Sequence, residues 1–214
     1  MKKSKLYNLY KQNSLLVTKT TIYSSLIINL IYGIFKLGTG IYYMSWWFIT
    51  FAVYYLLLCL MKVSIVKDIK KENSTSLKKE YQKLKSTGII LLFLNLILSG
   101  IITLIIMQDQ VIDYNGIIIY AVALYDFYLI ISAIINVIKY RKEHSPLLAA
   151  SKCINLTVAM ISMVSLEVAM IYQFGNNDSS FKLIMTGSTG LGICIINTIM
   201  SIYMIVRANK KLNS

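Results

Sequence analysis

The chain has 214 residues, of which 57% are hydrophobic, and it has a mean hydropathy of +0.63 and a formal net charge of +13. This composition, with a single proline, excludes an ordinary soluble domain. A strongly basic chain can bind nucleic acid. Here, however, the basic residues lie in short clusters between apolar stretches, which argues against nucleic acid as a partner.

Six apolar stretches define the expected architecture. A helix needs about 20 mostly apolar residues to cross the core of a bilayer. Such stretches lie at 22–43, 46–66, 88–107, 116–137, 147–174 and 183–206. The sequence therefore predicts an all-α integral membrane protein, a six-transmembrane-helix bundle that forms a single membrane domain over residues 1–214.

The first two spans are expected to form a tight hairpin, because only residues 40–45 separate them. Residues 1–20 are polar, and a span-length apolar run follows without a small-residue cleavage site, so we do not expect a cleaved signal peptide. The aromatic residues between Tyr42 and Phe48 are expected at the outer membrane interface, which favours Trp and Tyr.

The break at 67–86 is a substantial basic loop, and its second half, Ser76–Ser86, is expected to extend the third span as a helix. The other basic clusters precede the first span, follow the fourth and follow the sixth, whereas the breaks 40–45, 108–115 and 173–180 contain no Lys or Arg. Loops rich in Lys and Arg stay cytoplasmic. We therefore expect a multi-pass protein of the cell (plasma) membrane, with the N and C termini in the cytoplasm and basic loops at anionic lipid headgroups.

The last two spans carry small residues that predict close helix packing. The fifth, 147–174, is longer than one crossing and is expected to tilt or to begin in the cytoplasm. In the sixth, Gly187, Gly190 and Gly192 are expected to let a neighbouring helix approach. The cysteines lie inside spans without CxxC or His-paired spacing, so no metal site or cofactor is expected: Cys59, Cys153 and Cys194.

Charged residues inside the spans are the candidate functional groups: Lys36, Asp126, Lys152 and Glu167. An ionised group at the bilayer centre costs a few kcal/mol, so it is kept where it is paired or faces a wet cavity. Lys36 and Glu167 lie at similar depth below the outer surface, and we expect them to be partners or to share a polar cavity. Either they form a structural ion pair, or Glu167 or Asp126 binds a proton or cation during transport. Among the polar residues of the spans, Asn155 is a further binding candidate.

Two stretches resemble the membrane half of the cation diffusion facilitator (cation efflux) family. Asn29–Leu58 resembles the first hairpin of that family, and Ser145–Ser162 resembles the entry into its fifth span. The residues that carry the first likeness are Asn29, Lys36, Gly40 and Ser45. The resemblance implies a six-helix transporter and a homodimer.

The same resemblance implies metal ligands on the second and fifth spans, and the chain departs from the family there. Tyr54 and Leu58 occupy the positions on the second span. On the fifth span the positions fall on Ile154 and Val158 or, with a shift of one residue, on Asn155 and Ala159. These residues cannot supply a tetrahedral zinc site. We also expect no C-terminal cytoplasmic metal-binding domain, so the metal chemistry is lost or replaced.

These features bear on three classes of function. A transporter-like carrier, built on this bundle and coupled to protons, would use Glu167, Asp126 and Lys36 as its polar centre. The alternative is a non-transporting membrane scaffold or regulatory subunit. An enzyme is not expected, because the chain has no HExxH or GxSxG motif and no paired carboxylates at catalytic spacing.

Overall fold

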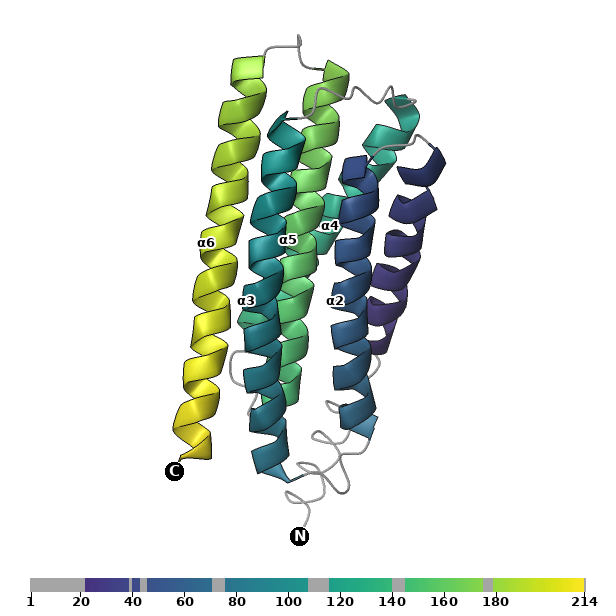
Figure 1. The fold of residues 1–214 in the computed structure, drawn as a ribbon. Helices are drawn as coiled ribbons and strands as arrows, with labels where there is room; N and C mark the ends of the chain where they lie inside the picture. Colours follow the sequence, from purple (N-terminus) through teal and green to yellow (C-terminus); the bar gives the residue numbers. More distant parts are fainter. Residues whose placement is uncertain are drawn as a thin grey trace.

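The fold is all-helical in a computed structural model that describes residues 22–38, 40–42, 46–70, 76–107, 116–139, 145–174 and 179–213. The N-terminal helix covers Ile22–Tyr42. It is followed by α2 (Trp46–Lys70), α3 (Leu77–Met107), α4 (Gly116–Lys139), α5 (Pro146–Phe174) and α6 (Ser179–Leu212). The helices run alternately up and down, so the N-terminal helix begins at the end of the bundle where α6 ends (Figure 1).

Five of these helices are long and apolar enough to cross a membrane: Ile22–Tyr42, Ile49–Asp68, Leu77–Met107, Pro146–Ile171 and Ser180–Leu212. In α4, which has 24 residues, the described apolar stretch Ala123–Asn136 is shorter, and a sixth crossing there stays a prediction. The all-α, multi-pass membrane architecture is thus confirmed. Large apolar side chains on the outer surface, such as Phe93 (65% exposed) and Leu191 (67% exposed), contact lipid in such a protein.

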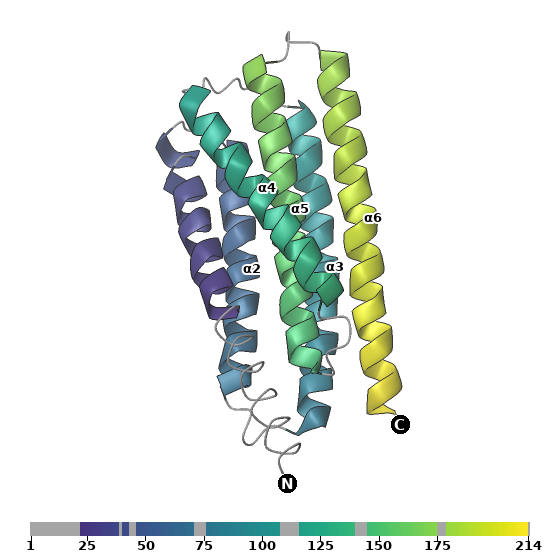
Figure 2. The same ribbon diagram turned by 180° about the vertical axis from the view of Figure 1, so that it is seen from behind.

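α5 is the central helix of the bundle. It packs against α2, α3, α4 and α6. In its most apolar part, 61% of the residues are buried, against 28% in α6, which lies at the edge. Figure 2 shows α4 crossing α5 obliquely, with the N-terminal helix and α2 on the other side of α4 from α6. Side chains of the N-terminal helix, α2, α4 and α5 meet in this part of the bundle.

α3 and α6 form a closely packed pair, and glycines make the approach possible. A Cβ atom added to Gly88 would lie 3.0 Å from the backbone oxygen of Ser201, and one added to Gly190 would lie 2.8 Å from the side chain of Ile102. The predicted packing role is confirmed for Gly190. It is not confirmed for Gly192, where a Cβ would meet nothing within 4 Å, or for Gly187, where it would make only ordinary contact at 3.9 Å. Between the two close approaches, the Asn95 amide donates to Thr198 Oγ1 at 2.9 Å and to the backbone oxygen of Cys194 at 3.0 Å.

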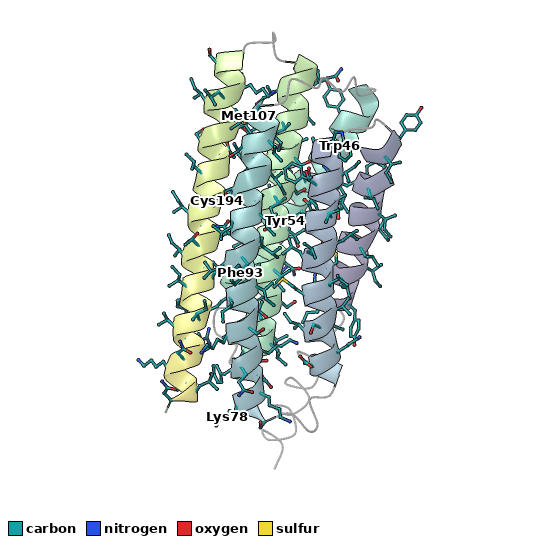
Figure 3. The ribbon with its side chains drawn as sticks, viewed as in Figure 1. Trp46, Tyr54, Lys78, Phe93, Met107 and Cys194 are labelled. Atoms are coloured by element: carbon teal, nitrogen blue, oxygen red, sulfur yellow. The ribbon has the colours of Figure 1, made fainter. Side chains whose placement is uncertain are left out.

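The helices are longer than the expected spans at the end of the bundle that carries the basic residues. α3 begins at Leu77, which confirms that the second half of the basic loop extends the third span. α2 continues to Lys70 and α6 to Leu212, beyond the expected limits at 66 and 206. An ion pair links α2 to α3 here, with Lys83 Nζ 3.1 Å from Asp68 Oδ2. Figure 3 places Lys78 at this end of α3 and Met107 at the other.

Of the aromatic residues expected at the outer interface, the structure describes the side chains of Tyr42 and Trp46, which lie at the opposite end of the bundle, and those of Tyr43, Trp47 and Phe48 are outside the described part. Both side chains are strongly exposed, at 82% for Tyr42 and 67% for Trp46, and Figure 3 shows Trp46 at this end of α2. Exposed aromatic rings beside the apolar surface match the interfacial position that Trp and Tyr favour. Lys182, near the start of α6, is a buried cation (7% exposed) at this same end.

Candidate functional site

Asp126 lies in α4 at the centre of a buried polar cluster. Its side chain is fully buried, and its Oδ1 atom accepts a hydrogen bond of 2.9 Å from Tyr32 Oη on the N-terminal helix. Ser162 on α5 donates to the same oxygen. The second oxygen, Oδ2, is buried and has no hydrogen-bond partner among the residues that the structure describes. This oxygen can therefore accept a proton or a ligand without breaking an existing hydrogen bond.

Lys36 provides the positive charge of the same cluster. Its side chain is 3% exposed, and Nζ donates a hydrogen bond to Ser165 on α5. The ammonium group also lies 5.2 Å from the centre of the Tyr32 ring, and it interacts electrostatically with the Asp126 carboxylate. Because Tyr32 and Lys36 are four residues apart, they share one face of the N-terminal helix. This face is held against α4 by the hydrogen bond and the opposite charge of Asp126, and against α5 by the hydrogen bond to Ser165.

Lys62 in α2 is a buried charge that the sequence analysis did not single out. The side chain is fully buried, and Nζ donates to Asn155 Oδ1 at 2.5 Å and to Ser25 Oγ at 2.6 Å. Ser25 also donates to Asn155 Oδ1, at 3.2 Å. The predicted binding candidate Asn155 is thus part of a three-residue cluster that joins the N-terminal helix, α2 and α5.

A polar cavity of about 90 Å³ lies next to the Lys62 cluster, between the N-terminal helix, α4 and α5. Ser25 and Asn155 form part of its wall. The other polar side chains that line it are Ser24, Asn29, Ser132 and Asn136. Asn29 is three residues, or nearly one turn, before Tyr32 on the N-terminal helix, so the cavity approaches the Asp126 cluster from the end of the bundle that carries the basic residues.

The predicted pairing of Lys36 with Glu167 is wrong. Lys36 bonds to Ser165, and because residues two positions apart on a helix are separated by about 200°, Glu167 faces the other side of α5. Its carboxylate accepts a hydrogen bond of 3.1 Å from Thr189 on α6. The depth of the two residues was compatible with pairing, but their positions around the helix axes were not.

Glu167 instead lies in an apolar groove of about 460 Å³ between α4, α5 and α6. The surrounding side chains are large and apolar: Phe127, Met163, Met170, Phe174, Phe181 and Met185. Several of them are strongly exposed on the outer surface of the bundle, including Phe127 at 56% and Phe174 at 54%. Glu167 and Asp126 therefore belong to two separate environments.

The resemblance implies metal ligands at positions that, without the shift of one residue, lie in the apolar core. Tyr54, Leu58, Ile154 and Val158 are each at most 2% exposed and pack in one hydrophobic cluster. With the shift, the fifth-span positions fall on Asn155, which bonds to Lys62, and on buried Ala159. Within the described ranges, no group of three or more His, Cys, Asp and Glu side chains is placed to hold a metal ion. Comparison of the chain with protein-family models, curated proteins and solved structures found no match. The likeness to the cation diffusion facilitators thus stays a prediction.

Proposed function

We propose that this protein is a membrane carrier, coupled to protons, whose solute path runs between the N-terminal helix, α2, α4 and α5. The main support for this proposal is the cluster around Asp126. The Asp126 carboxylate is fully buried, and one of its oxygens has no hydrogen-bond partner among the described residues. A carboxylate at membrane depth is expensive, and it marks proton or solute pathways in many membrane proteins. The nearby polar cavity supplies a place for the solute, and Lys36 supplies the charge that balances Asp126 while the carboxylate is ionised.

The proposal assigns a simple role to each member of the cluster. Asp126 accepts a proton, and its neutral form no longer attracts the Lys36 ammonium. Tyr32 and Ser162, which both donate to Oδ1, keep the carboxyl group in place in either state. Protonation thereby changes the interaction between the N-terminal helix and α4, the two helices that form the cavity with α5.

The same proposal includes the orientation of the chain. Both termini face the cytoplasm of a cell whose plasma membrane holds the protein, and the basic helix ends contact anionic lipid headgroups. The support is the distribution of charge, since Lys78 and Lys83 lie in the first turns of α3 and Lys210 in the last turn of α6. The start of α3 and the end of α6 are at the same end of the bundle (Figure 1). A homodimer, which the family resemblance implies, is the assembly we propose for this carrier.

The test is carbodiimide labelling of the intact protein in reconstituted vesicles, read by mass spectrometry. This reagent reacts with a protonated carboxyl group, so we expect Asp126 to be labelled and the extent of labelling to fall as the pH rises. The same vesicles, loaded with a pH-sensitive dye, should show proton flux that Asp126→Asn abolishes. Resistance of Asp126 to labelling at every pH, together with no flux for any solute, would refute the carrier.

A non-transporting membrane subunit is the second candidate, and the groove around Glu167 favours it. Glu167 is half-buried among exposed apolar side chains, where an additional helix would cover it. In that case Glu167→Gln should weaken association with the partner helix and leave vesicle flux unchanged. Site-specific photo-crosslinking from Met163, on the wall of this groove, would detect such a partner in native membranes.

A further inference from the structure

The buried charge of Lys62 is not balanced by any carboxylate in the described part of the chain. The acidic residues described there lie elsewhere: Asp68 and Glu80 near the basic end of the bundle, Asp126 beside Lys36, and Glu167 on the opposite side of α5. Lys62 is held by two neutral groups, and the titratable group with which it interacts is the Cys59 thiol. An ammonium ion that is buried without an anion is costly at membrane depth.

The lining of the adjoining cavity has the chemistry that an anion requires. Asn29, Asn136 and Asn155 contribute amide groups and the serines contribute hydroxyl groups, and none of the described residues that line this cavity is acidic. Two of these donors already have partners, since the Asn136 amide donates to Ser132 Oγ at 3.4 Å and the Ser25 hydroxyl donates to Asn155 Oδ1. Asn155 Oδ1 already accepts from Lys62 and Ser25, so its Nδ2 donor is not used within that cluster. The described lining thus contains hydrogen-bond donors and no negative charge, and the Lys62 ammonium bonds to two of its residues, Ser25 and Asn155.

The dimensions of the cavity limit the size of the ligand. Its volume of about 90 Å³ corresponds to roughly three water molecules at about 30 Å³ each. A planar carboxylate group or a phosphate group fits such a space, whereas a larger solute would need the helices to separate. Ser25 and Asn155 stand between the cavity and Lys62, so a small displacement of either lets the flexible lysine chain reach the ligand.

We propose that the cavity between the N-terminal helix, α4 and α5 binds a small oxyanion, a carboxylate or a phosphate, with Lys62 as its counter-charge. This inference deepens the carrier function and rests on it for the statement that the anion is the transported solute. The binding itself needs no transport, because it depends only on the Lys62 cluster and the polar lining. An oxyanion that enters with a proton on Asp126 would also leave the net charge of the four-helix region unchanged.

The experiment is calorimetric titration of the full-length protein, purified in neutral detergent, with sodium phosphate and sodium acetate at constant ionic strength. We expect saturable binding of at least one of them, and a loss of about tenfold or more in affinity for Lys62→Gln. The matched control is Lys78→Gln, which removes the same charge from an exposed site at the basic end of α3. Asn136→Ala, on the cavity wall, should also weaken binding and tests the site if Lys62→Gln fails to fold.

Further outcomes of this titration distinguish a lipid headgroup from a free anion, and distinguish failure of the anion site from failure of the carrier. Lys62-dependent binding of a short-chain phosphatidic acid, with no binding of free phosphate or acetate, would support the anion site and identify a lipid headgroup as its occupant. Binding of no anion, or equal binding by wild type and Lys62→Gln, would overturn the site even if proton flux is present. Saturable anion binding in a protein without flux would keep the site and refute only the carrier.

Discussion

The α3–α6 interface gives the sharpest stability prediction, because α3 contains one glycine in tight contact and another in open space. At Gly88, an added Cβ would lie 2.9 Å from Ile205 Cγ1, 3.0 Å from the backbone oxygen of Ser201 and 3.3 Å from Met204 Cβ. At Gly100, twelve residues along the same helix, an added Cβ would meet nothing within 4 Å. Alanine at both positions therefore makes the same chemical change in opposite environments.

The size of the expected destabilisation at Gly88 depends on the contact with the backbone oxygen of Ser201. The Ile205 side chain can rotate away, but the Ser201 carbonyl belongs to the helix backbone, so α6 must shift to accept Gly88→Ala. Overpacking of this kind typically costs about 1–3 kcal/mol. The gain in helix propensity, about 1 kcal/mol at most, applies to both substitutions and cancels in their difference. We expect Gly88→Ala to be less stable than Gly100→Ala by about 1–3 kcal/mol.

The assay is unfolding of the purified protein by SDS in mixed micelles, followed by circular dichroism, with both variants at the same lipid-to-protein ratio. Gly190→Ala provides a second tight site, where the obstacle is the Ile102 side chain and the cost should be smaller than at Gly88. Equal stability of Gly88→Ala and Gly100→Ala, within about 0.5 kcal/mol, would refute the close approach of α3 and α6.

Three further predictions concern the polar contacts. Lys36→Met and Asp126→Leu should each destabilise the protein by about 3–5 kcal/mol, because each leaves an uncompensated buried charge. The double variant should recover most of this loss in the same unfolding assay, and additive losses would contradict the coupling of Lys36 and Asp126. Asn95→Leu should lower the free energy of unfolding by only about 0.5–2 kcal/mol. The substitution removes the hydrogen bonds to α6, but it also removes Asn95 Oδ1, a buried oxygen that has no partner in the described structure. A larger loss would show that the amide does more than join two helices. Asp68→Asn should change the free energy of unfolding by less than about 1 kcal/mol, and high salt should remove the difference, because its ion pair with Lys83 is 30–37% exposed; an effect that survives high salt would disprove this reading.

The helical architecture was predictable because it depends on a property that is summed along the chain. A run of about 20 apolar residues forms a helix in a bilayer whatever its neighbours are, since the backbone must satisfy its own hydrogen bonds there. The same reasoning placed Asp126 and Lys36 inside the membrane. The helix ends were less predictable, because α2 and α3 continue past the apolar region into segments with good helix-forming residues, as in Leu77–Lys85.

The positions of charges around the helix axes were not predictable in the same way. Depth in the bilayer follows from counting residues, and it made Lys36 and Glu167 look like partners. Which residues face each other depends on the rotation and order of the helices, and these come from packing rather than from the sequence of one helix. The carboxylate that interacts with Lys36 is instead Asp126, another of the charged residues expected inside the spans.

Lys62 was overlooked for a different reason. It lies among strongly apolar residues near the basic end of the second span, where a lysine is easily read as part of the adjoining cationic cluster that begins at Lys67. The signal that the sequence did contain is that Lys62 lies inside the expected span 46–66. The structure adds that Cys59 and Ile65, three residues to either side, are buried, so Lys62 shares their inward face. A cation on the inward face of a span cannot reach the surface as freely as one on the outward face.

The distribution of polar groups in the bundle bears on the choice between carrier and scaffold. The α3–α6 contact contains glycines and a hydrogen-bonded neutral amide, which are the residue types that typically join helices in lipid. The region between the N-terminal helix, α2, α4 and α5 contains instead the buried charges Lys36, Lys62 and Asp126. Because a buried ion pair is often no more stable than apolar residues of the same size, packing alone does not explain these charges. The Lys36→Met/Asp126→Leu double variant separates the two readings: a scaffold should keep both its stability and its interactions, whereas a carrier should stay folded and lose its flux.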